Sequence, residues 1–194
     1  MFRKFQIKDI IFLAVLAAVT TLFGGLAMPV MSSRLFGVQT LVTCLFYTLF
    51  CAIGLKRVSK PGTLTLFGLF TGFPLLFMAP VMFFDNFLAA LLAEAVVLLV
   101  FRGYRKHAAV VTAGALWMAL TVPLSLPFSL WVNSWSQKGA SSFANFRSTP
   151  VWQSALVFGG VVVLSVCGAL LGVKIAKELQ RAGKLRGNAE DSDA

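Results

Sequence analysis

Charged residues are scarce in this sequence. Only 12% of its 194 residues are Asp, Glu, Lys or Arg, whereas a soluble domain carries about 25%. Among the charged residues, acidic ones are fewer, with 7 against 17 basic ones. Hydrophobic residues make up 58% of the chain. Water cannot be the solvent for most of such a surface. The composition therefore predicts an integral membrane protein of one domain, in contact with a lipid bilayer.

Motifs of catalysis and cofactor binding are also missing. The chain has no HExxH, no GxSxG, no paired glutamates and no Walker loop, so it cannot hydrolyse ATP by itself. The single histidine, His107, lies in a basic turn, and we interpret it as a loop residue. The three cysteines lie inside apolar runs, without the spacing of a metal site. The sequence predicts no enzyme, no metal and no cofactor in this chain.

What the sequence has instead is long apolar runs. An 18-residue run spans roughly 27 Å as a helix, close to the thickness of a bilayer core. Unbroken apolarity over such lengths excludes alternating strands. We therefore predict an all-α fold in one membrane domain, residues 1–186, followed by a polar, disordered tail, residues 187–194. The six predicted transmembrane helices are residues 10–27, 36–55, 63–79, 84–101, 108–131 and 151–175.

Basic residues fall almost entirely on one side of these helices. With a cytoplasmic N-terminus, the inside segments hold 14 of the 17 and the outside loops hold 3. Cytoplasmic loops collect Lys and Arg, so both termini are predicted inside a prokaryotic plasma membrane, and the net charge of +10 implies no nucleic-acid partner. The inside residues are Arg3, Lys4, Lys8, Lys56, Arg57, Lys60, Arg102, Arg105, Lys106, Lys174, Lys177, Arg181, Lys184 and Arg186.

The first run also resembles a secretory signal peptide, because basic residues precede an apolar stretch. It is longer than a usual signal core, and no small-x-small cleavage site follows before Met28. The charge asymmetry holds only for an even number of spans. We therefore expect this helix to be retained.

Polar and aromatic residues near the predicted outer ends form the candidate substrate site. Small-molecule sites are mostly apolar with a few placed polar groups. Two alternatives stand beside this prediction: the tryptophans form an interfacial aromatic belt, or Asp85 caps the N-terminus of a helix that begins at Phe84. The candidates are Arg34, Gln39, Asp85, Asn86, Trp131, Asn133, Trp135 and Trp152, with Arg147 as a further one.

Glu94 lies midway along the predicted fourth helix. An ionisable group inside a membrane is costly, so it is either a functional acid or a hydrogen-bonded packing residue, and the sequence leaves both open. Asp85 lies nine residues earlier, which rotates a helix by about 180°. The two acids are therefore predicted to face opposite sides and to form separate sites.

Four short stretches resemble a known family. They are residues 8–18 (KDIIFLAVLAA), the turn 60–62 (KPG), and residues 167–172 (CGALLG) followed by 182–185 (AGKL). In this order, they resemble the substrate-binding S component of an energy-coupling factor (ECF) vitamin transporter, in the branch labelled MptD or Trep-Strep. The resemblance covers nearly the whole chain.

This resemblance implies a function. The protein would capture a small nutrient outside and dock to a membrane coupling subunit that carries two cytoplasmic ATPases. Ala14 and Ala18 match the family's Ala-xxx-Ala docking pattern, and the loop 28–35 would close the outer site. The aromatic, methionine-rich and acid-poor site favours a heterocyclic vitamin or a flat, largely apolar compound such as a tetrapyrrole. The alternatives are a proton-coupled carrier that uses Glu94 and a non-catalytic accessory subunit.

Overall fold

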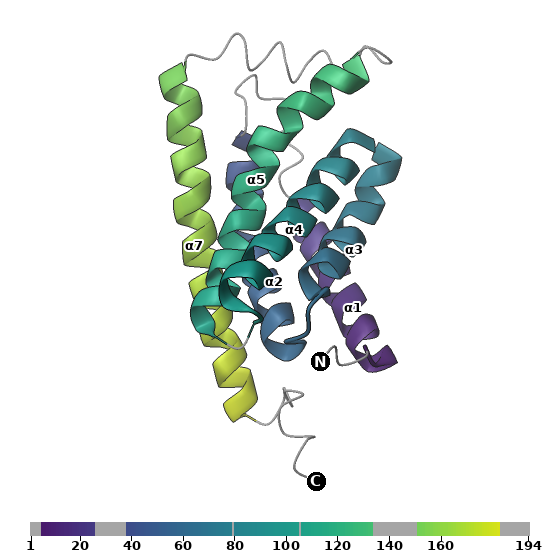
Figure 1. The fold of residues 1–194 in the computed structure, drawn as a ribbon, viewed down its shortest axis with the longest axis vertical. Helices are drawn as coiled ribbons and strands as arrows, with labels where there is room; N and C mark the ends of the chain where they lie inside the picture. The colour runs from purple at the N-terminus through teal and green to yellow at the C-terminus, as the bar shows by residue number, and fades with distance from the viewer. Residues whose placement is uncertain (1–4, 26–37, 79, 105, 134–150, 183–194) are drawn as a thin grey trace.

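The computed structural model describes residues 5–25, 38–78, 80–104, 106–133 and 151–182. All regular structure in these ranges is helical (Figure 1). The helices are α1 (Ile7–Gly25), α2 (Val38–Arg57), α3 (Thr63–Met78), α4 (Pro80–Phe101), α5 (His107–Asn133) and α7 (Val151–Arg181). The predicted all-α fold with six helices is confirmed.

Five of these helices are long and apolar enough to cross a membrane. The exception is α3, whose 16 residues contain Pro74. Proline removes a backbone hydrogen bond from a helix interior. In a bilayer, neighbouring helices must then satisfy the freed backbone groups, so α3 depends on its contacts with the other helices.

One predicted boundary is wrong in a way that matters. Helix α4 begins at Pro80, not at Phe84, and its first turn contains no acid. Proline favours this position because its missing N–H would lack a helical partner in any case. Asp85 and Asn86 therefore lie in the second turn of α4, and Asp85 is not the N-cap. At the other end of the chain, α7 continues to Arg181, beyond the predicted residue 175.

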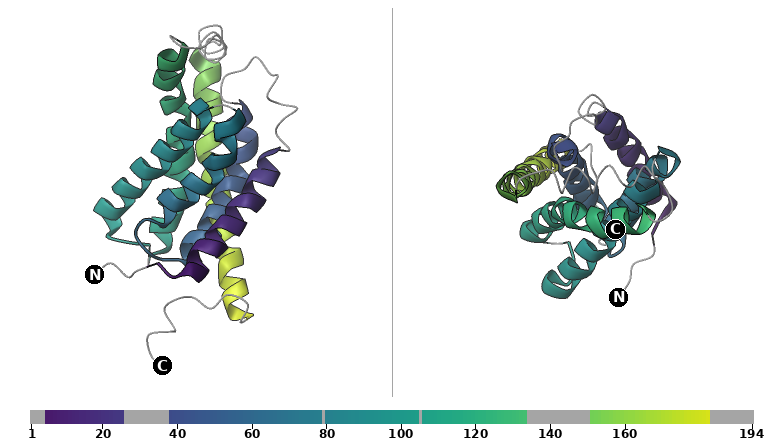
Figure 2. Two further views of the ribbon diagram at one scale, coloured as in Figure 1. Left: turned by 90° about the vertical axis from the view of Figure 1, so that its right-hand side faces the viewer. Right: turned by 90° about the horizontal axis from the view of Figure 1, so that it is seen from above.

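The bundle has a well-connected interior and one peripheral helix. Helix α2 packs along α7, α3 pairs with α4, and α5 packs against α4, α7 and α2. Helix α1 packs mainly against α2 and α3, and Figure 2 shows it at the edge of the bundle. Helix α1 also has the smallest buried share of the five spans, 22% of its residues.

One end of the bundle gathers all the basic residues that the structure describes. The start of α1, the turns between α2 and α3 and between α4 and α5, and the end of α7 lie at this end, at the bottom of Figure 1. We call it the basic end. Its described cations are Lys8, Lys56, Arg57, Lys60, Arg102, Lys106, Lys174, Lys177 and Arg181. This arrangement agrees with the alternation of sides deduced from the sequence.

Small residues set the closest helix contacts. A Cβ on Gly168 of α7 would overlap Thr48 Oγ1 and the Leu45 carbonyl of α2. A Cβ on Gly68 of α3 would overlap the Ala90 Cβ of α4. Such contacts let membrane helices approach closely, and they fix the rotation of each helix against its neighbour.

We predict that Gly168→Ala destabilises the protein by about 1–3 kcal/mol, because overpacking forces α7 away from α2. The matched control is Gly159→Ala on the same helix, where an added Cβ meets nothing within 4 Å. The control should be neutral or stabilising, since alanine is the better helix former. Thermal unfolding of both variants in detergent measures the difference, and equal melting temperatures would contradict the α2–α7 packing.

Candidate functional site

A polar cluster joins three helices toward the end opposite the basic end. Asn86 of α4 donates from Nδ2 to the Gly68 carbonyl at 3.2 Å and to Thr71 Oγ1 at 3.0 Å, both on α3. The Trp117 indole N–H of α5 donates to the Asn86 carbonyl at 3.2 Å. We call these residues the Asn86 cluster. The side chain of Asn86 is thereby used in cross-linking helices α3 and α4.

Asp85 lies beside this cluster and is buried, with 7% of its surface exposed. Its Oδ1 atom has no hydrogen-bond partner among the described residues. Phe83 and Phe87 stack in parallel with ring centroids 6.0 Å apart, but they lie two residues to either side of Asp85 and project from a different face of α4. The site therefore contains a buried acid with one unsatisfied oxygen.

The other predicted substrate residues are placed less fully. Trp152 has 62% of its surface exposed near the start of α7, as an interfacial tryptophan would. Gln39 lies on α2, and Trp131 and Asn133 lie on the last turn of α5, but the structure describes only their backbones. Arg34, Trp135 and Arg147 lie outside the described residues, as do the loop 28–35 and the whole predicted tail, residues 187–194. The structure thus brings together Asp85 and Asn86, which are adjacent in sequence.

Glu94 forms a second polar cluster, nearer the basic end. Glu94 is buried, with 4% of its surface exposed. Its carboxylate accepts four hydrogen bonds. The donors are the Gly62 N–H at 2.6 Å, the Thr65 N–H at 2.9 Å, Thr65 Oγ1 at 2.5 Å and the Tyr104 hydroxyl at 2.8 Å. The first turn of a helix has N–H groups without helical partners. Glu94 therefore caps α3 from a neighbouring helix, and its negative charge suits the α3 dipole.

Tyr104 reaches Glu94 through a tight turn after α4. Arg102 and Gly103 both have positive φ, 56° and 145°, a reversal that ends α4 and directs Tyr104 into the bundle. The Tyr104 side chain is almost completely buried. Its burial, together with the charge of Glu94, raises the pKa of the phenol. The hydroxyl therefore stays protonated and remains a hydrogen-bond donor at neutral pH.

An ion pair fastens α1 to the rest of the bundle at the basic end. Lys60 Nζ lies 2.6 Å from Asp9 Oδ2, and both side chains are buried. Asp9 Oδ2 also accepts from the Gln6 N–H at 3.2 Å, at the start of α1. Lys60 belongs to the turn before α3, so the pair ties α1 to the turn whose Gly62 binds Glu94.

The ion pair and the two polar clusters contain residues to which the sequence analysis gave no role at a site. Asp9 and Lys60 lie inside the stretches that carry the family resemblance, but nothing local shows that they meet across 51 positions. An acid just before the first predicted helix and a lysine before Pro-Gly were the available signals. For Tyr104 the sequence offers only an aromatic residue in a basic turn, and for Trp117 only an aromatic residue in an apolar run.

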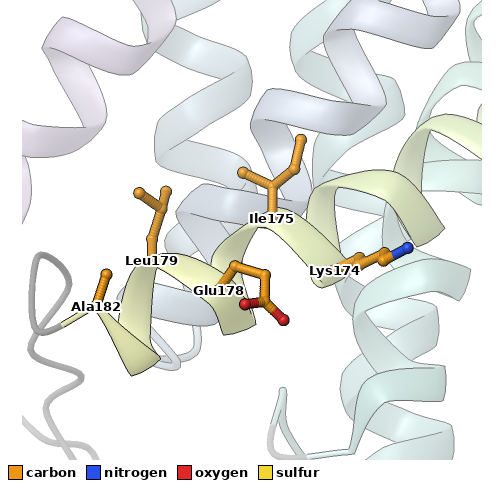
Figure 3. A pocket seen from close by; sticks show the side chains of 5 residues that line it. All are labelled: Lys174, Ile175, Glu178, Leu179 and Ala182. Carbon is orange, nitrogen blue, oxygen red and sulfur yellow. The ribbon is translucent and has the colours of Figure 1, made fainter.

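Neither cluster is a metal site. No three His, Cys, Asp or Glu side chains converge anywhere in the ranges that the structure describes. A shallow groove of about 520 Å³ lies on the last turns of α7 at the basic end, lined by Lys174, Ile175, Glu178, Leu179 and Ala182 (Figure 3). It lies far along the bundle from Asp85 and is separate from the candidate substrate site.

We expect Glu94→Gln to lower the stability by about 1–3 kcal/mol, because an amide offers one acceptor oxygen and turns its N–H groups toward other donors. Tyr104→Phe is the milder comparison, since it removes only one of the four hydrogen bonds. Melting temperatures in detergent should rank wild type above Tyr104→Phe and Tyr104→Phe above Glu94→Gln. A Glu94→Gln protein as stable as wild type would show that Glu94 does not cap α3.

The Asp9–Lys60 pair should show strong coupling. Removing one partner of a buried ion pair leaves an uncompensated charge and costs about 3–5 kcal/mol. We predict that Asp9→Leu and Lys60→Met each destabilise strongly, whereas the double variant loses less than either single variant. A double-mutant cycle of thermal unfolding measures this coupling, and additive losses would contradict it.

Comparison with known proteins places the chain in a family. No curated protein and no solved structure matches it. Residues 7–179 match the model of a family described as "Hypothetical bacterial integral membrane protein (Trep_Strep)". This match covers all six described helices almost completely and agrees with their apolar lengths. The chain therefore belongs to the Trep_Strep family of bacterial integral membrane proteins, and it is a multi-pass membrane protein.

Proposed function

We propose that this protein is the substrate-capture (S) subunit of an ECF-type ABC importer. In this proposal it binds a small nutrient at the end opposite the basic end. A membrane coupling subunit and two cytoplasmic ATPases then deliver the nutrient to the cytoplasm, and this chain itself is not an enzyme. The proposal rests on the sequence resemblance described above and on the position of α1.

The observation that carries the proposal is the exposure of α1. Leu13 and Ala17 face the bundle, whereas Ala18 is exposed and Ala14 is half-buried beside it. Small residues at i and i+4 let another helix approach closely. The peripheral helix α1 therefore presents a small-residue face, at Ala14 and Ala18, on which a coupling subunit can pack.

The base of α1 is held firmly in this arrangement. The Asp9–Lys60 pair fixes its start, and the Arg57 guanidinium lies 4.3 Å from the centre of the Phe12 ring. Gly54 of α2 sits beneath Leu13 and Leu16. These contacts join α1 to α2 and to the turn before α3, so a partner that docks on α1 acts on the helix bundle as a whole.

Glu94 gives little support to a proton-coupled carrier. Both of its oxygens accept hydrogen bonds from α3 and from Tyr104. Protonation of Glu94 would weaken the α3 cap, since the new O–H would face groups that already donate to both oxygens. The structural role that the sequence left open therefore fits these contacts better than a mobile proton site.

The test is assembly with the partner subunits. We expect the wild-type chain to copurify with the coupling subunit and both ATPases when the four are produced together. Replacing Ala14 and Ala18 together with leucine should reduce this assembly by tenfold or more, since close approach on α1 is lost. The control is Ala95→Leu, which adds one leucine at an exposed position of α4.

Two outcomes would count against the proposal. Failure of the wild-type chain to copurify with any coupling subunit would favour an accessory membrane protein of another kind. Intact assembly of the Ala14 and Ala18 double variant would reject the α1 docking face alone. Thermal unfolding of each variant shows whether a loss of assembly reflects a loss of fold.

A further inference from the structure

Asp85 differs from the other acidic side chains that the structure describes. Asp9 and Glu178 each form an ion pair. Glu94 accepts four hydrogen bonds. Asp85 Oδ1, in contrast, is buried without any donor among the described residues. An ionisable group in a membrane helix that lacks a partner is costly, and such groups mark functional sites.

The polar groups nearest to Asp85 in sequence are already committed. The Asn86 amide nitrogen donates to Gly68 and Thr71 of α3, and the Trp117 indole N–H donates to the Asn86 carbonyl. Neither of these two donors turns to Asp85 Oδ1. The Asn86 cluster therefore positions this turn of α4 and leaves that oxygen unsatisfied.

No described cation reaches Asp85 either. All nine described Lys and Arg residues lie at the basic end, whereas Asp85 is in the second turn of α4 at the opposite end. The other acid on α4, Glu94, is nine residues away, or about 13 Å along the axis. Within the described ranges, no positive charge balances the Asp85 carboxylate.

Three phenylalanines lie close to Asp85 in sequence. Phe83 and Phe87 stack with each other, and Phe84 packs edge-on against Phe83 with ring centroids 5.3 Å apart. Because Phe83 and Phe87 are two residues away on the helix, they project from a different face and do not enclose the carboxylate. An acid without a described partner in an apolar span suits a ligand that brings a positive charge.

We propose that Asp85 binds the positively charged group of the captured nutrient, so that the substrate is a small organic cation with an ammonium group or a cationic ring nitrogen. This inference rests on the proposed function. It narrows the substrate class from the flat, apolar compounds expected from composition to those that carry a positive charge. The Asn86 cluster acts as the positioning element, and Asp85 makes the contact.

The experiment compares Asp85→Asn, which removes the charge at constant shape, with Asp85→Glu, which keeps it. Each protein is purified from growing cells in mild detergent, and the small molecules that it releases on denaturation are identified by mass spectrometry. Wild type should release an organic cation. Asp85→Asn should release at least tenfold less of this cation, and Asp85→Glu should recover part of the difference.

Stability provides a second readout that a structural acid would not give. After removal of bound small molecules by exhaustive dilution, Asp85→Asn should melt at a higher temperature than wild type, because it removes an unpaired buried charge. Glu94→Gln on the same helix should melt at a lower temperature. The two conservative amide substitutions are thus expected to act in opposite directions.

Several results would overturn the inference. The first is that wild type releases only neutral or anionic molecules, or none. The second is that wild type and Asp85→Asn release equal amounts of the cation. The third is that empty Asp85→Asn melts at a lower temperature than empty wild type. The last result would mean that a basic residue of the chain, such as Arg34 or Arg147, already pairs with Asp85. Assembly with the coupling subunit does not depend on Asp85. Successful assembly without a bound cation therefore rejects the cation alone, and a bound cation without assembly rejects the ECF assignment alone.

Discussion

The Glu94 carboxylate holds the most demanding part of this bundle together. Helix α3 has only 16 residues and an internal proline, and its first turn presents N–H groups that helical geometry cannot satisfy. Hydrocarbon offers no water to replace the missing partners. By reaching across from α4 to Gly62, Thr65 and Tyr104, Glu94 supplies them and joins α3 to the turn that leads into α5. At the other end of the same helix pair, Asn86 makes the second cross-link.

Two acids on one helix therefore have opposite characters. Glu94 is surrounded by donors and stabilises the fold, whereas the Oδ1 atom of Asp85 is buried without a described donor. The same low dielectric that strengthens the bonds of Glu94 makes the isolation of Asp85 expensive. The fold thus leaves the cost of a buried acid in place at Asp85 and removes it at Glu94. Glu94 is the structural acid, and Asp85 is the candidate binding acid. The peripheral α1, fastened by Asp9 and Lys60, adds a third element, the surface that we propose for a partner.

Much of this arrangement follows from the sequence, and the reasons for the failures are specific. Long apolar runs predict the six helices because hydrophobicity over about 20 residues is a local property. The start of α4 was misplaced because Pro80 and Val81 read as a loop, although proline is favoured at a first helical turn. Asp85 thereby appeared to be a cap. That Asp85 and Glu94 face opposite sides of α4 stays a prediction from helical rotation. The partners of Glu94 were not predicted, because Gly62 and Tyr104 lie in turns without an apolar pattern.

By itself, the sequence determined that this chain is a multi-pass helical membrane protein with its basic residues gathered on one side. Both properties follow from the hydrophobicity and charge of each segment taken by itself. They do not depend on how the helices face one another. Only the tertiary structure decided which polar groups meet. Asp9 finds Lys60 across 51 positions, and Asn86 finds Gly68 across 18. These pairings depend on the rotation and approach of each helix, which close contacts such as that between Gly168 and Thr48 determine. The same packing satisfies Glu94 and leaves the Asp85 oxygen without a described donor.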